Sequence, residues 1–187
     1  MKKSIQAVMD CFPRIGQIGD ATLRDKVCRA WLQAWKSSDY AHLEDVSQWE
    51  PAREALGISN VDHTNGVVEC ALAMAGALES SRSLRIDRDI LIAAAVLHDV
   101  DKICLFNAAD GRPTDLGRHL GHVAAGVHLA MAAGLPLTVV HAIAAHSPNY
   151  SKISPQTVEA LILRQADDLF TRTWIMQRGQ AVSFEMR

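Results

Sequence analysis

The chain has 187 residues, of which 49% are hydrophobic but only 5% aromatic, and its formal net charge is −2. This length predicts one domain with a buried core, and the runs of alanine favour an all-α fold. The balanced charge argues against duplex nucleic acid as a partner, no apolar run reaches membrane-spanning length, and the four cysteines lack paired spacing, so we expect a cytoplasmic protein with reduced thiols that acts on small molecules.

The first 60 residues predict a helical extension that precedes the core. Residues 1–12 favour a short helix, and Asp20 is a candidate N-cap for an amphipathic helix over residues 22–35. Residues 37–60 are interrupted by proline and glycine, which predicts a connector with short helical turns. Three side chains of this connector could line a substrate pocket, although ordinary packing is the simpler interpretation: Tyr40, His42 and Trp49.

An apolar run that ends in charged residues, AAAVLHDVDK at positions 93–102, is the most informative stretch. A His98–Asp99 pair at the end of a buried helix is costly unless a partner satisfies it, and a divalent metal would do so. His63 begins the preceding helix, expected over residues 61–80. In an antiparallel hairpin the end of the second helix returns beside the start of the first, so His63 and His98 should meet.

The same reasoning predicts a second meeting point. His122 lies in the first part of a helix expected over residues 116–133, and His146 closes the helix that follows. An antiparallel arrangement of these two helices brings His122 beside His146.

Asp167 can also reach this end of the bundle. It lies roughly 18 Å along a helix that starts near Pro155, and the loop at 147–154 can span about 26 Å when extended. Asp167 shares an apolar stripe of its helix, whereas Asp168 shares a face with Arg164 and is expected to be a solvated, ion-paired neighbour.

These residues, in this order, resemble the HD-domain metal-dependent phosphohydrolases. In the two-metal branch of that family a histidine is followed by a His-Asp pair, two more histidines and an aspartate. The matching residues are His63, His98, Asp99, His122, His146 and Asp167. The neighbouring residues also resemble the family, in LHDVDK at 97–102, HVAAG at 122–126 and QADD at 165–168.

The resemblance covers about residues 60–172 and implies an all-α HD-domain helical bundle with its metal site between antiparallel helix pairs. We therefore expect a single domain over residues 1–187. It divides into an N-terminal extension (1–60), a metal-binding core (61–172) and a C-terminal tail (173–187).

The ligand set suggests two divalent transition-metal ions, drawn from Fe, Mn, Co, Ni or Zn. We assign four ligands to the first ion: His63, His98, Asp99 and Asp167. Asp99 would bridge to a second ion held by His122 and His146. Two ions so placed can share a hydroxide and direct it at a phosphate ester.

Three residues are candidates for a direct part in the chemistry: Asp99, Lys102 and His119. The resemblance implies that Lys102 lies near the substrate's phosphate, although a surface lysine at a helix end is the alternative. The residue before this lysine is glycine in many family members. Here it is Asp101, which adds negative charge near the expected phosphate. His119 could support His122 or transfer a proton, or be an ordinary surface residue.

The sequence therefore predicts a metal-dependent phosphohydrolase acting on a small phosphoester, nucleotide or phosphodiester through a metal-bridging hydroxide. One alternative is a mixed-valent di-iron oxygenase of the same fold, which would cleave a C–C or C–P bond. Another is a ligand-binding or regulatory module that keeps a metal for structure. We expect a phosphorylated small molecule as partner, no duplex nucleic acid and no membrane, and a homodimer is possible.

Overall fold

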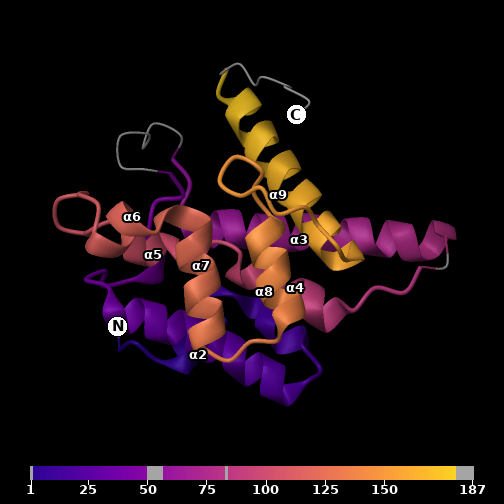
Figure 1. Ribbon diagram of the computed structural model, residues 1–187, viewed down its shortest axis with the longest axis horizontal. Helices are drawn as coiled ribbons and strands as arrows, with labels where there is room; N and C mark the ends of the chain where they lie inside the picture. The colour runs from indigo at the N-terminus through magenta and orange to yellow at the C-terminus, as the bar shows by residue number, and fades with distance from the viewer. Residues whose placement is uncertain (1, 50–56, 83, 180–187) are drawn as a thin grey trace.

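The computed structural model describes residues 2–49, 57–82 and 84–179 (Figure 1). These residues form helices and, apart from two isolated β-bridges, no extended pairing, so the all-α prediction is confirmed. The helices are α1 (Ile5–Cys11), α2 (Ala21–Ser37), α3 (Asn60–Arg82), α4 (Arg88–Leu97), α5 (Lys102–Leu105), α6 (Asp115–His119), α7 (Gly121–Ala132), α8 (Leu137–Ala145) and α9 (Val158–Gln177). Two 3₁₀ turns, η1 (Pro13–Gln17) and η2 (Leu43–Asp45), accompany them. Within the described ranges, no helix has the length and apolar character needed to cross a membrane.

Helix α4 is the central element, and it packs against α2, α3, α8 and α9 (Figure 1). The side chain of Asp87 caps its start by accepting the backbone N–H of Ile90 at 3.0 Å. Every residue from Leu91 to Leu97 is buried, as expected for a helix that is apolar on all sides. Because the helix is enclosed, the polar residues that follow it, His98 and Asp99, are carried into the interior.

The N-terminal extension packs on this central helix through α2. Asp20 caps α2 as predicted, since its carboxylate accepts the backbone N–H groups of Thr22 and Leu23. The buried Trp31 of α2 donates its indole N–H to the Val96 carbonyl at 3.0 Å. The last carbonyls of a helix lack partners within the helix, and this bond satisfies one of them at the end of α4.

Helices α3 and α9 pack against each other (Figure 1), and Gly66 of α3 lies at their contact with Phe170 of α9. A Cβ atom on Gly66 would lie 2.2 Å from Cε2 of Phe170, so the absence of a side chain is what lets the ring approach. The Phe170 ring also meets the His63 ring edge to face, with centroids 5.6 Å apart. This contact fixes α9 against the first turns of α3.

The prediction of a single helix over residues 116–133 is wrong, because the chain forms two helices there, α6 and α7. Gly121, at the start of α7, has φ of +66°, a left-handed conformation that glycine adopts without strain. His119 therefore ends one helix and His122 belongs to the next. The shared face that a continuous helix would have given these two histidines does not form.

Parts of two predicted segments lie outside the described residues, namely 50–56 of the connector and 180–187 of the tail. The described connector contains η2 and is tied to the start of α3 by backbone hydrogen bonds, including Asn60 N–H to Val46 O at 2.7 Å. The helix expected over residues 61–80 is slightly longer in the structure, because α3 runs from Asn60 to Arg82.

Candidate metal centre

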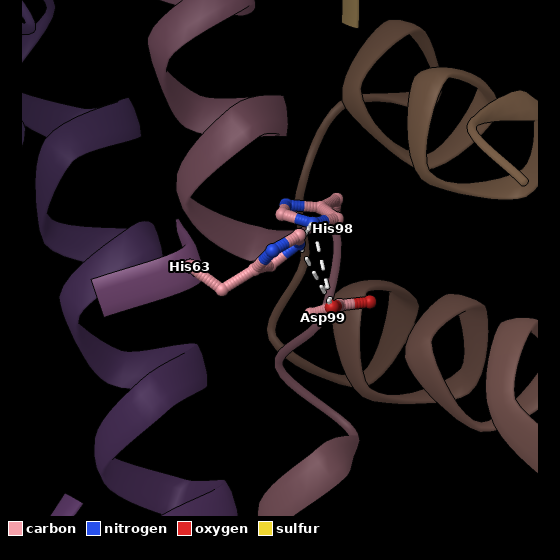
Figure 2. Close-up of side chains that lie close together, drawn as sticks. All are labelled: His63, His98 and Asp99. Carbon is pink, nitrogen blue, oxygen red and sulfur yellow. Dashed lines mark hydrogen bonds and ion pairs between the residues drawn. The ribbon is translucent and has the colours of Figure 1, made fainter. Parts of the chain in front are cut away.

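The two predicted histidine pairs both form. His63, in the first turn of α3, and His98, at the C-terminal end of α4, bring their Nε2 atoms to 3.2 Å. Figure 2 shows these two rings converging from separate helices above Asp99. His122, in the first turn of α7, and His146, at the end of α8, bring their Nε2 atoms to 3.1 Å. In each pair, a helix start meets a helix end, as the antiparallel arrangement requires.

Asp99 lies between the two pairs and faces both of them. Its Oδ2 is 3.6 Å from His63 Nε2 and 3.4 Å from His98 Nε2. Its Oδ1 is 3.1 Å from His122 Nε2 and 3.7 Å from His146 Nε2. The residue is almost completely buried. A single carboxylate thus presents one oxygen to each histidine pair.

Asp167, on α9, joins the pair on the α3 side. Its Oδ1 lies 3.2 Å from His63 Nε2 and 3.9 Å from His98 Nε2. We call the group on this side the first half-site: His63, His98, Asp167 and Asp99 Oδ2. The group on the other side is the second half-site: His122, His146 and Asp99 Oδ1.

Asp168 is outside both half-sites. It is ion-paired and partly exposed, as predicted, but both of its oxygens accept from Arg172 Nε at 2.7 Å. The sequence suggested Arg164 as the partner. Positions one turn before and one turn after a helical residue are equally near, so the spacing could not choose between them.

Three of the rings are oriented by acceptors behind them. They donate Nδ1–H over 2.6 to 2.8 Å, His98 to the Ala95 carbonyl, His146 to the Ile143 carbonyl and His122 to the Asp101 carboxylate. A proton held on Nδ1 leaves the lone pair on Nε2, which is the atom that faces the centre of the cluster. This is how the outer partners of metal-binding histidines usually work.

The donor set and its spacing fit metal ions. Two imidazole nitrogens about 2.1 Å from one ion lie about 3.0 Å apart at a right angle and about 3.4 Å apart in a tetrahedron. The observed separations of 3.2 Å and 3.1 Å fall in this range. Each of two residue triplets, His63–His98–Asp99 and Asp99–His122–His146, offers three ligand atoms within 4.8 Å of one another. The described residues could therefore hold a divalent metal in each half-site.

The pKa values of the histidines show where protons reside when no metal is bound. Burial alone would lower the pKa of His98, but the Asp99 carboxylate raises it to about 9. Burial likewise opposes the protonation of His122, yet Asp101 raises its pKa to about 9. Burial and the positive charges of His122 and His98 lower the pKa of His146 to about 4. A protonated ring in each half-site thus offsets the buried carboxylates, and a metal cation would displace these protons.

Asp167, Asp99 and Lys102 are charged at neutral pH. Burial would raise the pKa of Asp167, but the hydrogen bond from His63 and the charge of His98 lower it to about 2. Burial acts on Asp99 in the same direction, and the charges of His98 and Lys102 hold its pKa well below the usual value. Burial would lower the pKa of Lys102, but Asp99 keeps it above its ordinary value.

Two buried amide side chains that sequence reasoning missed hold the Asp99 carboxylate. Gln48 Nε2 donates to Asp99 Oδ2 at 2.6 Å, and Asn60 Nδ2 donates to Gln48 Oε1 at 3.0 Å. The bridge between Ser47 and Ser59 brings the two amides together. A lone glutamine and a lone asparagine in a connector carry no sequence signal, so only the folded chain reveals this contact.

The Asp101 side chain contacts His122 rather than the cavity next to the cluster. Its side chain is fully buried and accepts from His122 Nδ1 at 2.8 Å. It is not among the described residues that line the cavity next to the cluster. The turn after α4 places this carboxylate behind His122, and its charge, after that of Asp99, still raises the pKa of Lys102. The expectation that Asp101 adds negative charge near the phosphate stays a prediction.

The cavity beside the second half-site has a volume of about 680 Å³. His122, Lys102 and Gln48 line it together with four aromatic side chains, Tyr40, Trp49, Phe106 and Tyr150. His42 and His119 are exposed, and neither is among the described residues that line it. The cavity is therefore lined by Lys102, by part of the histidine–aspartate cluster and by these four aromatic side chains, which we call the aromatic wall.

The arrangement of the helices and the histidine–aspartate cluster agrees with a sequence comparison. The HD domain family model matches residues 60–172, more than half of the chain. The chain belongs to the HD domain family, and the resemblance noted in its sequence is confirmed.

Among curated proteins, the chain is similar to the dihydroneopterin 2',3'-cyclic phosphate phosphodiesterase of Methanocaldococcus jannaschii. The two are 31% identical over 163 residues, which cover 81% of this chain and 64% of the relative. The chain thus spans a little under two thirds of that protein's length. A search of solved structures found no significant match.

Proposed function

We propose that the chain is a metal-dependent phosphohydrolase that acts on a small phosphoester with two divalent metal ions. The observation that carries the proposal is the position of Asp99, whose oxygens lie 3.1 to 3.7 Å from two separate histidine pairs. A buried carboxylate shared in this way suits two neighbouring cations. The cavity beside the cluster supports a catalytic site rather than a regulatory module, since structural metal sites are closed.

The proposed ligands are the six side chains of the two half-sites, and the ions are Fe, Mn, Co, Ni or Zn. When bound, such ions supply Lewis acidity and lower the pKa of a nucleophilic water. Lys102 lines the cavity and stabilises the negative charge that builds on the phosphoryl oxygens. The water oxygen bonds to phosphorus, the ester P–O bond breaks, and the alcohol leaves with a proton. His119, which is exposed and is not among the described residues that line the cavity, has no part in this proposal.

The proposed substrate is a phosphodiester attached to a planar ring. Two observations support this class. The cavity has four aromatic side chains, and rings of this kind stack on planar heterocycles. The relative from Methanocaldococcus jannaschii is named for a substrate that joins a pterin ring to a cyclic phosphate.

We also propose that residues 1–60 form an extension of the same domain rather than a separate unit, with the core at 61–172 and the tail at 173–187. Packing of α2 on α4 and the bond from Gln48 to Asp99 support this organisation. The extension then supplies both a structural cover and part of the active site.

The first experiment separates hydrolysis from oxygen chemistry. Protein loaded with Mn²⁺ or Co²⁺ under argon is offered 2',3'-cyclic nucleotides, bis(p-nitrophenyl) phosphate and p-nitrophenyl phosphate, and products are followed by ³¹P NMR. We expect a phosphodiester to be hydrolysed without O₂. Turnover that needs iron and consumes O₂ stoichiometrically would instead establish the oxygenase. Metal binding without turnover of any probe would favour the regulatory module.

A second experiment tests the ring. Phe106→Ala should raise KM for a 2',3'-cyclic nucleotide and leave KM unchanged for a cyclic phosphate that carries no ring. Leu137→Ala, at an exposed position outside the cavity lining, is the control. Equal effects on both substrates would contradict a stacking role for the aromatic wall.

A further inference from the structure

Asp101 is a buried carboxylate that the proposed chemistry does not use. It follows the His98–Asp99 pair, and none of its surface is exposed. Its Oδ2 accepts from His122 Nδ1 at 2.8 Å, while its Oδ1 has no hydrogen-bond partner within the described part of the chain. Burying a carboxyl group with so few hydrogen-bond partners is costly, so a physical reason for its position is needed.

The positions of the histidines on their helices explain why His122 needs such a partner. His98 and His146 lie at helix C-termini, where the last carbonyls are free, and each donates Nδ1–H to the carbonyl three residues earlier. His122 lies in the first turn of α7, where the free backbone groups are N–H donors. Its ring therefore has to take an acceptor from another element, and Asp101 provides one.

Gly126 makes room for this carboxylate. It lies one turn after His122, on the same face of α7. A Cβ atom at this position would be 3.2 Å from Asp101 Oδ1 and 3.4 Å from Ile143 Cγ2. A side chain there would force the carboxylate to shift by a few tenths of an ångström, so Gly126 and Asp101 form a matched pair.

We propose that Asp101 is a positioning residue for the second half-site, which holds the His122 proton on Nδ1 and strengthens Nε2 as a metal ligand. The effect should be confined to one half-site. Among the proposed metal ligands, His122 is the one whose hydrogen bond to Asp101 the structure records. Carboxylate partners of this kind change metal affinity by about 10–100-fold. The inference rests on the proposed metal centre and does not depend on the substrate.

The test measures metal binding rather than activity. Metal-free wild type, Asp101→Asn and Asp110→Asn, an exposed control, are titrated with Co²⁺ and followed by visible absorption and by the shifted Nδ1–H resonances of the bound histidines. We expect Asp101→Asn to weaken one of two ions about 10–100-fold and to move one Nδ1–H resonance, with the other ion unchanged. Asp101→Asn should add nothing to the loss caused by His122→Ala.

A second pair of variants tests the matched glycine. Gly126→Ala should weaken the same ion in the wild type and have no effect in the Asp101→Gly background, where the carboxylate is gone. Unchanged affinity in Asp101→Asn, an equal loss of both ions, or additivity with His122→Ala overturns the inference. A wild type that binds one ion and is insensitive to His122→Ala refutes the two-metal function as well, which separates the two failures.

Discussion

Replacing Asp99 with asparagine should weaken metal binding in both half-sites at once. The reason is geometric, because Oδ2 lies 3.4 Å from His98 Nε2 and Oδ1 lies 3.1 Å from His122 Nε2. The amide keeps the size of the side chain and removes its charge. By comparison, His63→Ala should affect the first half-site alone, and His146→Ala the second alone.

The size of this effect follows from linkage. Even an outer partner of a ligand changes metal affinity by about 10–100-fold, and an ionised ligand should matter at least as much. At a free metal concentration about 100 times Kd, one bound ion stabilises the native state by about 2.7 kcal/mol, which falls to about 1.4 or 0.4 kcal/mol when binding is tenfold or hundredfold weaker. Since 1 kcal/mol moves Tm by about 2–4 °C in a domain of this size, the rise caused by each ion should fall from about 5–11 °C to about 1–6 °C.

Metal content by mass spectrometry and thermal melts with and without Mn²⁺ measure this directly. The control is Asp168→Asn, which removes a carboxylate on α9 that pairs with Arg172 outside both half-sites. It should retain wild-type metal content and the full rise in Tm. If Asp99→Asn keeps one ion at wild-type affinity while losing the other, Asp99 serves a single ion and the bridging role is refuted.

Three further predictions follow from other contacts. Gly66→Ala should cost about 1–3 kcal/mol by overpacking and should weaken the first half-site selectively, because Phe170 then moves α9; urea unfolding and metal titration check this, and a full-strength first half-site would contradict it. The metal-free protein should lose stability from pH 6.5 to pH 9. The pKa values of His98 and His122 are about 9 in the folded protein and about 6.5 in the unfolded chain, so protonation of these rings stabilises the folded state at low pH and this stabilisation is lost as they deprotonate. The rise in Tm caused by metal should grow over the same pH interval, and thermal melts with and without chelator measure it. Plots of Tm against pH that stay parallel with and without metal would show that protons and metal do not compete. Lys102→Ala should lower kcat/KM about 10²–10³-fold with metal content unchanged, whereas Lys152→Ala, at an exposed position, should match the wild type, and equal losses in both variants would remove the assigned role.

The ends of helices were readable from the sequence because they depend on local chemistry. The Asp20 cap and the apolar spacing after it predict α2 within a residue or two. The run before His98 likewise predicts a buried helix that ends at a polar pair. Once helix ends are known and connections are short, the meeting of His63 with His98 follows, since neighbouring helices pack antiparallel.

The prediction of one continuous helix over residues 116–133 failed because of the local backbone conformation. A helical pattern continues through residues 116–133, but Gly121 takes a positive φ and splits it. Glycine is compatible with both conformations, so its sequence context could not decide between them. The placement of His119 was tied to that choice, and it ends α6 with an exposed side chain.

Apart from the break at Gly121, the sequence by itself determined the principal helices and the order of the histidines and aspartates along them, because periodicity and capping act over a few residues. Tertiary structure decided which second partners those side chains acquire. Gln48 reaches Asp99 from 51 residues away, and Asp101 turns behind His122 into space that Gly126 leaves open. Such contacts depend on how separate elements pack against one another, and an interaction between distant residues leaves no period in a single chain.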